Sequence, residues 1–233
     1  MSRKKSSSRF RNAVIQIEDR QYDYLEAITL LKNLPSAKFI ETVEAHIVLG
    51  IDPKYADQQL RSNVVLPKGT GKNIKIAVIA RGEKAVQALK AGADIAEVDG
   101  IINQIENQSY DFDKLIATPD VMPLLAKLGR ILGPKGLMPS PKAGTVTWDV
   151  LSAVKEFKGG KLEYKVDKAG ILHIPFGKIN FSVDDLAQNL CSVQESIDRN
   201  RPSGAKGKYW KKLYICSTMG PSISINMSSL FNR

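Results

Sequence analysis

Cysteine and histidine are both scarce in this chain of 233 residues, which contains only Cys191, Cys216, His46 and His173. The two cysteines form no CxxC pair and are too few for a disulfide framework, so we expect a protein of a reducing compartment. So few thiol and imidazole groups also argue against a zinc site. We therefore expect no metal and no cofactor, and we interpret the histidines as structural or surface residues.

Long apolar segments are missing as well. No stretch reaches the ~20 apolar residues that a membrane-spanning helix requires. The basic, serine-rich start, MSRKKSSSRFRNA, is not followed by the apolar segment of a secretory signal, so we interpret it as a basic arm. Attachment to a membrane surface through this arm is disfavoured, because the arm has no apolar face. Its cations are Arg3, Lys4, Lys5, Arg9 and Arg11.

The motifs of nucleotide-handling enzymes are also absent. The GTGK run at 69–72 lacks the spacing of a phosphate-binding loop, and Asn73 follows the lysine where that loop has Ser or Thr. The strand expected at 74–80 is not followed by G-x-G-x-x-G, and the chain has no G-x-S-x-G nucleophile elbow. We therefore expect a protein that is not an enzyme. The alternative is a nucleotide- or phosphate-handling enzyme built on the central α/β segment.

Positive charge, by contrast, is abundant. The chain has 34 Lys and Arg residues against 24 Asp and Glu residues, which gives a net charge of +10. An excess of this size favours a polyanionic partner, and the clustering of the cations favours nucleic acid over a merely solubilising charge.

Two basic zones lie outside the arm. One, at 129–144, contains Arg130, Lys135 and Lys142 within a stretch that has no acidic residue. Four glycines and three prolines punctuate it, which favours a functional loop over a merely flexible one. The other zone, at 199–212, contains Lys206 and Lys208 next to an aromatic pair, which either stacks on a base or is buried. That pair is Tyr209 and Trp210.

Hydrophobic periodicity predicts strands and helices that change in character along the chain. The first part has a helix at 22–34, capped by Asp23 and ended by Pro35, and then a half-buried strand at 42–50. An extended piece follows at 63–66, and the Gly- and Lys-rich loop at 67–73 is a candidate hinge.

The central part alternates between strands and helices, which is typical of a small parallel α/β unit with right-handed crossovers. The expected strands are 74–80, 95–98 and 115–117, and the expected helices are 83–91, 101–107, one opened by Pro119, and 148–158.

The last part, after Gly159 and Gly160, again has the character of an antiparallel fold. We expect a hairpin of 162–166 with 171–175, a strand at 179–183, a helix at 184–199, and strands at 212–217 and 222–226.

These patterns predict two domains of the α+β and α/β classes. Residues 1–68 plus 160–233 would form a discontinuous α+β domain with a split β-α-β-like arrangement. A Rossmann-like parallel α/β domain would be inserted at 69–159. We infer that both chain ends belong to one domain, because the two end segments have a similar antiparallel pattern of strands and helices.

Two short segments are candidates for contact with RNA. Lys38 and Phe39 precede the strand at 42–50, where a phenylalanine is either a core residue or packs against a nucleotide. The run 217–221, Ser-Thr-Met-Gly-Pro, lies between two strands, and its small hydroxyl side chains suit hydrogen bonds to 2′-hydroxyls and phosphates. From the residues alone, an ordinary turn explains this run equally well.

Several long motifs, in this order, resemble the family of large-subunit ribosomal protein one. The resemblance covers about residues 10–227, and at Ser140 the chain departs from the asparagine that is usual in the family. The matching segments are AKFIETVEAHIVLGIDPK, RSNVVLPKGTGK, ATPDVMPLLAKLGRILGPKGLMPSPKAGTV, GKINFS and RPSGAKGKYWKKLYICSTMGPSISIN.

The resemblance implies a non-catalytic, two-domain protein of the ribosomal stalk beside the exit site. It implies partners in large-subunit rRNA, exit-site tRNA, other large-subunit ribosomal proteins and the protein's own messenger RNA, whose translation bacterial members commonly repress. It implies a location on the ribosome, in the plastid stroma or the bacterial cytoplasm. The RNA contacts of the family map onto Lys38, Phe39, Thr42, Glu44, Lys178, Asn180, Ser217, Thr218, Met219 and Gly220.

Overall fold

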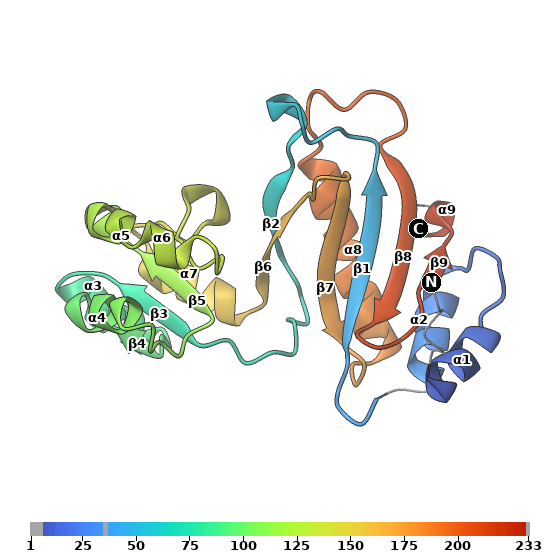
Figure 1. The fold of residues 1–233 in the computed structure, drawn as a ribbon, viewed down its shortest axis with the longest axis horizontal. Coiled ribbons are helices and arrows are strands. Elements are labelled where there is room, and N and C mark those ends of the chain that lie inside the picture. Colours follow the sequence, from blue (N-terminus) through green and yellow to red (C-terminus); the bar gives the residue numbers. More distant parts are fainter. Residues whose placement is uncertain (1–6, 35–36, 232–233) are drawn as a thin grey trace, which may run out of the picture. The chain divides into compact units, whose positions relative to one another are not determined.

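The computed structural model describes residues 7–34 and 37–231, which divide into two compact units (Figure 1). The first unit consists of the described residues up to Gly71 together with those from Tyr164 onward, and the second is Lys72–Glu163. The mixed class predicted from the sequence, with antiparallel sheets and a parallel α/β part, is confirmed. That the two units are separate domains with the expected boundaries stays a prediction.

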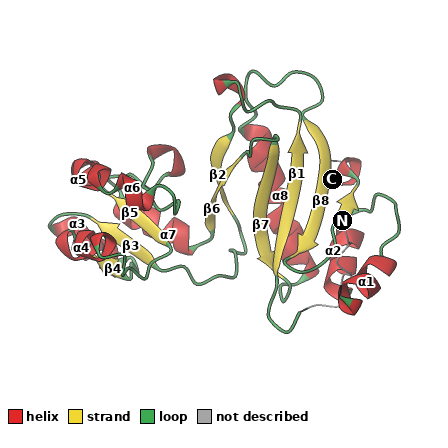
Figure 2. Cartoon of the chain, in the orientation of Figure 1, coloured by secondary structure: helices red, strands yellow, loops and turns green. Residues whose placement is uncertain are grey.

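The first unit is organised around a four-stranded sheet with the order β7-β1-β8-β9 (Figure 2). All neighbouring strands in it are antiparallel. The strand β1 comes from the early part of the chain and lies between two strands from the late part, so the two end segments of the chain share one sheet. The strands are β1 (Thr42–Leu49), β7 (Ile171–Lys178), β8 (Trp210–Ser217) and β9 (Ile223–Ile225).

One face of this sheet is covered by helices α2 (Tyr24–Asn33) and α8 (Val183–Arg199) (Figure 1). The alternation of β1 turns every second side chain toward these helices. Both helices begin as the sequence predicts, because Asp23 caps α2 and the acidic start of α8 follows the Ser182 cap. The predicted stripe of α8 is buried, and it consists of Leu186, Leu190, Val193 and Ile197.

Shorter elements complete the first unit. They are α1 (Ser8–Ile15), α9 (Met227–Phe231) and the 3₁₀ turn η1 (Ala56–Gln58). Part of the predicted basic arm is therefore helical, since Ser7 caps α1 and Ala13 is buried. Arg3, Lys4 and Lys5 of the arm lie outside the described residues, as does Pro35. Within residues 7–34 and 37–231, no helix has both the length and the apolar character needed to cross a membrane.

Of two predictions for the late part of the chain, one holds in part and one is wrong. The hairpin predicted from 162–166 and 171–175 forms at its turn, where Val166 and Leu172 make an antiparallel bridge, but the strand β6 (Lys161–Lys165) pairs with β2 (Arg61–Val65). The strand predicted at 179–183 does not form. There the Phe181 amide closes a turn on the carbonyl oxygen of Lys178, and α8 then begins.

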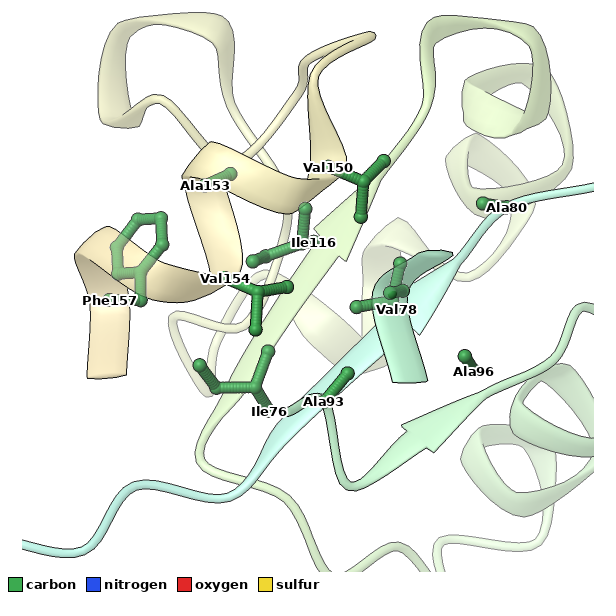
Figure 3. Close-up of a cluster of buried hydrophobic side chains, with 11 residues drawn as sticks. Ile76, Val78, Ala80, Ala93, Ala96, Ile116, Val150, Ala153, Val154 and Phe157 are labelled. Atoms are coloured by element: carbon green, nitrogen blue, oxygen red, sulfur yellow. The ribbon is translucent and has the colours of Figure 1, made fainter. Parts of the chain in front are cut away.

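The second unit contains a three-stranded parallel sheet with the order β4-β3-β5, built from β3 (Ile76–Ile79), β4 (Ile95–Ala96) and β5 (Lys114–Ala117). Side chains of β3 alternate between two apolar clusters, one on each face. One cluster joins Ile76 and Val78 to α7, where Val154 and Phe157 are fully buried (Figure 3). The helices are α3 (Glu83–Lys90), α4 (Asp99–Glu106), α5 (Met122–Lys127), α6 (Gly129–Leu132) and α7 (Val150–Lys158).

The segment 129–144 has more structure than the predicted loop. It contains α6 and the 3₁₀ turn η3 (Pro141–Ala143), and η2 (Pro119–Val121) precedes α5 with proline in its first turn, as expected. Leu132 and Ala143 are buried, which fixes both ends of the segment in the second unit.

Asn189 holds the segment of the first unit that ends at Gly71, where the chain passes into the second unit. Its fully buried side chain donates to the carbonyl oxygens of Gly69 and Phe176, and it accepts a hydrogen bond from the backbone N–H of Lys68. Replacing Asn189 by alanine removes the partner of all three backbone groups, of which the Phe176 carbonyl is buried, so we expect the free energy of unfolding to fall by ~2–4 kcal/mol in urea titration. The exposed neighbour Gln188→Ala should change it by less than ~0.5 kcal/mol, and equal effects would contradict this role.

Candidate RNA-binding surface

The beginning of β1 and the end of β8 lie side by side, with Val43 opposite Ser217. Just beyond this pair, the N–H of Thr218 donates to the carbonyl oxygen of Thr42 at 3.1 Å, and the N–H of Thr42 donates to the Thr218 hydroxyl at 3.0 Å. The segment that contains Lys38 and the run 217–220 therefore meet at one end of the sheet.

The end of β7 joins them from the other side of β1. Lys178 lies opposite Thr42, and its Nζ donates to Thr42 Oγ1 at 2.8 Å. Asn180 follows in the exposed turn after β7. Three of the predicted RNA-contacting segments, distant in sequence, are thus brought together by the register of β1 with its two neighbours.

The side chain of Glu41 lies beneath this meeting point and is only 1% exposed. Its carboxylate accepts hydrogen bonds from the Ser217 hydroxyl at 2.7 Å, from the Met219 N–H at 2.9 Å and from the Ala37 N–H. Burial raises the pKa of Glu41, but these hydrogen bonds and the positive charge of Arg9 together outweigh burial, and the net effect lowers the pKa. Glu41 is therefore ionised at neutral pH.

Glu41 is the residue of this surface that the sequence analysis missed. A signal was present, because the alternation that places Val43, Ala45 and Ile47 on the buried side of the strand places Glu41 there as well. A carboxylate in that position needs partners, and they come from a segment far along the chain.

Large apolar side chains are exposed at the same end of the sheet. Phe39 is 53% exposed and Met219 is 51% exposed, and Ile40 is exposed as well. Lys38 and Thr218 are also exposed. The surface thus offers apolar, hydroxyl and cationic groups together, which is the combination that unstacked RNA bases and their backbone require.

Several of the predicted contact residues are wholly or partly covered. Ser217 is 8% exposed, and its hydroxyl donates to Glu41, so its side chain is engaged within the protein. Gly220 supports the turn, because a Cβ atom there would lie 2.5 Å from Ser217 Oγ. Glu44 is half-buried on the sheet face opposite the helices, where Cys216 pairs with it in register.

The secondary basic residues of the first unit are not at this surface. Lys206 and Lys208 are exposed in the loop that precedes β8, whereas Ser217 ends that strand. The remaining three, all in the second unit, are also exposed, and Lys135 stands over the ring of Tyr110. They are Arg130, Lys135 and Lys142.

Of the two alternatives for the aromatic pair, the structure selects burial. Tyr209 and Trp210 are both buried, and Trp210 Nε1 donates to Asp198 Oδ1 at 2.7 Å. Neither ring is available to stack on a base.

The two histidines meet on the sheet face opposite the helices. The Nδ1 atoms of His46 and His173 are 2.8 Å apart, and His46 Nε2 lies 3.1 Å from Cys216 Sγ. Burial lowers the pKa of His46, His173 lowers it further, and Glu44 opposes the shift. Among the described residues, no group of three or more His, Cys, Asp or Glu side chains has the arrangement to hold a metal ion.

Comparison with known proteins places these features in context. The family model described as "Ribosomal protein L1p/L10e family" matches residues 30–221. Similar proteins include the large ribosomal subunit protein uL1c of Pyropia yezoensis, 62% identical over 97% of this chain and 99% of that protein. The protein of the same name in Guillardia theta is 62% identical over 98% of both chains. The large ribosomal subunit protein uL1 of Trichormus variabilis is 59% identical over 97% of this chain and 95% of its own.

Acidification is expected to destabilise the protein through His46. Because folding lowers the pKa of His46 below its ordinary value of 6.5, the unfolded chain binds a proton there more readily, so stability falls as the pH drops through 6.5. The melting temperature should therefore decrease between pH 7.5 and pH 5.5, and His46→Gln should flatten this decrease. Parallel curves for the two proteins would show that His46 does not carry the effect.

Proposed function

Because the chain belongs to the ribosomal protein L1p/L10e family, we propose that it binds large-subunit rRNA at the mobile stalk near the exit site. The chain is a protein of the large ribosomal subunit, of the plastid and cyanobacterial type, and not an enzyme. Family membership thus confirms the expectation of a non-catalytic protein and argues against the alternative of a nucleotide- or phosphate-handling enzyme. The proposed compartment is the plastid stroma or the bacterial cytoplasm.

The observation that supports rRNA binding is the convergence of three distant segments at one end of the sheet. Exposed Phe39 and Met219 supply the apolar contacts on which an unstacked base can pack. Lys38 and Asn180 are exposed beside them and supply hydrogen bonds to phosphates or 2′-hydroxyls, as does Thr218. The proposed contacts are those that the family resemblance implies: Lys38, Phe39, Thr42, Glu44, Lys178, Asn180, Ser217, Thr218, Met219 and Gly220.

The net charge of +10 supports the same conclusion, since each cation placed near a phosphate releases counterions and raises affinity. We assign a further set of exposed cations to secondary, sequence-independent contacts with RNA. They are Arg130, Lys135, Lys142, Lys206 and Lys208.

Three finer roles are proposed from the family resemblance. The protein helps to release deacylated tRNA from the exit site, it contacts other large-subunit ribosomal proteins, and it represses translation of its own messenger RNA through a similar RNA fold.

Binding to an rRNA fragment that contains the stalk is expected to depend on the surface more than on the secondary cations. Met219→Asp places a negative charge among the proposed contacts, and it should weaken binding by ~10–100-fold, measured as the dissociation constant at fixed salt. Thr218→Val should also weaken binding, whereas Lys142→Ala should change it by less than ~3-fold. Equal effects of all three changes would mean that the recognition surface is on the other unit.

The affinity of the unaltered protein should fall linearly on a plot of log K against log salt concentration. The matched competitor is a DNA duplex of the same length. Salt-insensitive binding, or equal affinity for the duplex, would contradict the proposed function.

A further inference from the structure

We propose that Glu41 is a positioning residue that holds the RNA-binding surface in its binding conformation, an inference that rests on the proposed function. Glu41 is buried and does not itself reach the surface. We infer that its carboxylate affects RNA binding through the two segments that it connects, one that contains Phe39 and one that contains Met219.

The connection is made by both carboxylate oxygens. Oε2 accepts from the Ser217 hydroxyl and from the N–H of Met219, while Oε1 accepts from the N–H of Ala37. The carbonyl oxygen of Glu41 also accepts from the N–H of Ile179, at the end of β7. One residue therefore ties together the segment before β1, the turn after β7 and the run after β8.

The arrangement requires a carboxylate rather than any polar side chain. Three donors converge on two oxygens, and an ionised carboxylate is a pure acceptor. A glutamine has one acceptor oxygen and one NH₂ group, so either orientation places a donor against a donor at one end. At 1% exposure there is little access for water to repair the mismatch, and the unpaired segment is released.

The consequence for RNA concerns the exposed apolar side chains. The Ala37 N–H is two residues before Phe39, and the Met219 N–H is the amide of the exposed methionine itself. Fixing both amides on one buried anchor sets the separation and orientation of Phe39 and Met219 before RNA arrives. Preorganisation of this kind raises affinity, because fewer groups must be ordered upon binding.

The direction in which a charge-neutralising substitution changes the affinity for RNA distinguishes positioning from simple electrostatics. A negative charge beneath a surface for a polyanion repels it, so removing that charge strengthens binding if Glu41 acts only through its field. If Glu41 positions the surface, Glu41→Gln weakens binding despite the more favourable charge.

The experiment compares full-length proteins in binding to the stalk rRNA fragment at fixed salt. We expect Glu41→Gln to raise the dissociation constant about 10-fold, and to speed hydrogen exchange at the Met219 and Ala37 amides. The matched control is Glu195→Gln, which removes the same charge from an exposed position on α8 and should leave affinity unchanged or slightly higher. Equal or tighter binding by Glu41→Gln would overturn the proposal.

A second variant tests the proposal even if Glu41→Gln does not fold. Ser217→Ala removes one donor and leaves Glu41 intact, and it should weaken binding by ~3-fold. In the double variant, the loss should not exceed that of Glu41→Gln alone, because both changes break the same contact. Fully additive losses, or unchanged binding by Ser217→Ala when Glu41→Gln does not fold, would overturn the inference. Failure of the unaltered protein to bind the fragment would instead overturn the proposed function.

Discussion

The pairing of β1 with β7 on one side and β8 on the other is the interaction on which the first unit depends. It joins residues such as Val43 and Ser217, which lie far apart in the chain, and it creates both the sheet and the place where the candidate surface is built. The helices α2 and α8 pack against each other and against the sheet that this pairing completes. Stability and the proposed RNA-binding surface therefore have the same origin in the first unit.

The second unit has a different basis. Its short parallel strands are buried on both faces, so its core consists of two apolar clusters separated by the sheet. None of the ten proposed primary contacts comes from this unit. It contributes exposed cations on a segment whose ends are anchored by Leu132 and Ala143, which suits sequence-independent attraction better than detailed recognition.

Local periodicity in the sequence was sufficient to predict β1, the apolar stripe of α8 and the strand–helix alternation of the second unit, because each depends on residues close in sequence. It was insufficient where the choice of partner is non-local. The segment 162–166 was expected to pair with 171–175, yet β6 pairs with β2, and β7 pairs with β1. Glu41 was missed for the same reason, since its partners Ser217 and Met219 become neighbours only when the sheet has formed. The residues alone made Lys38-Phe39 and the run 217–220 candidates, but they could not separate that run from an ordinary turn. Lys178 and Asn180 came only from the family resemblance.

The central position of β1 also orders events during synthesis of the chain. The amino-terminal half of the surface, including Phe39, leaves the translating ribosome long before Ser217 and Met219, which supply its other half. Until β8 is made, Glu41 lacks two of its three side-chain hydrogen bonds and β1 lacks one of its two neighbours. An unfinished chain therefore lacks the assembled surface, and under the proposed function only the nearly complete protein competes for RNA.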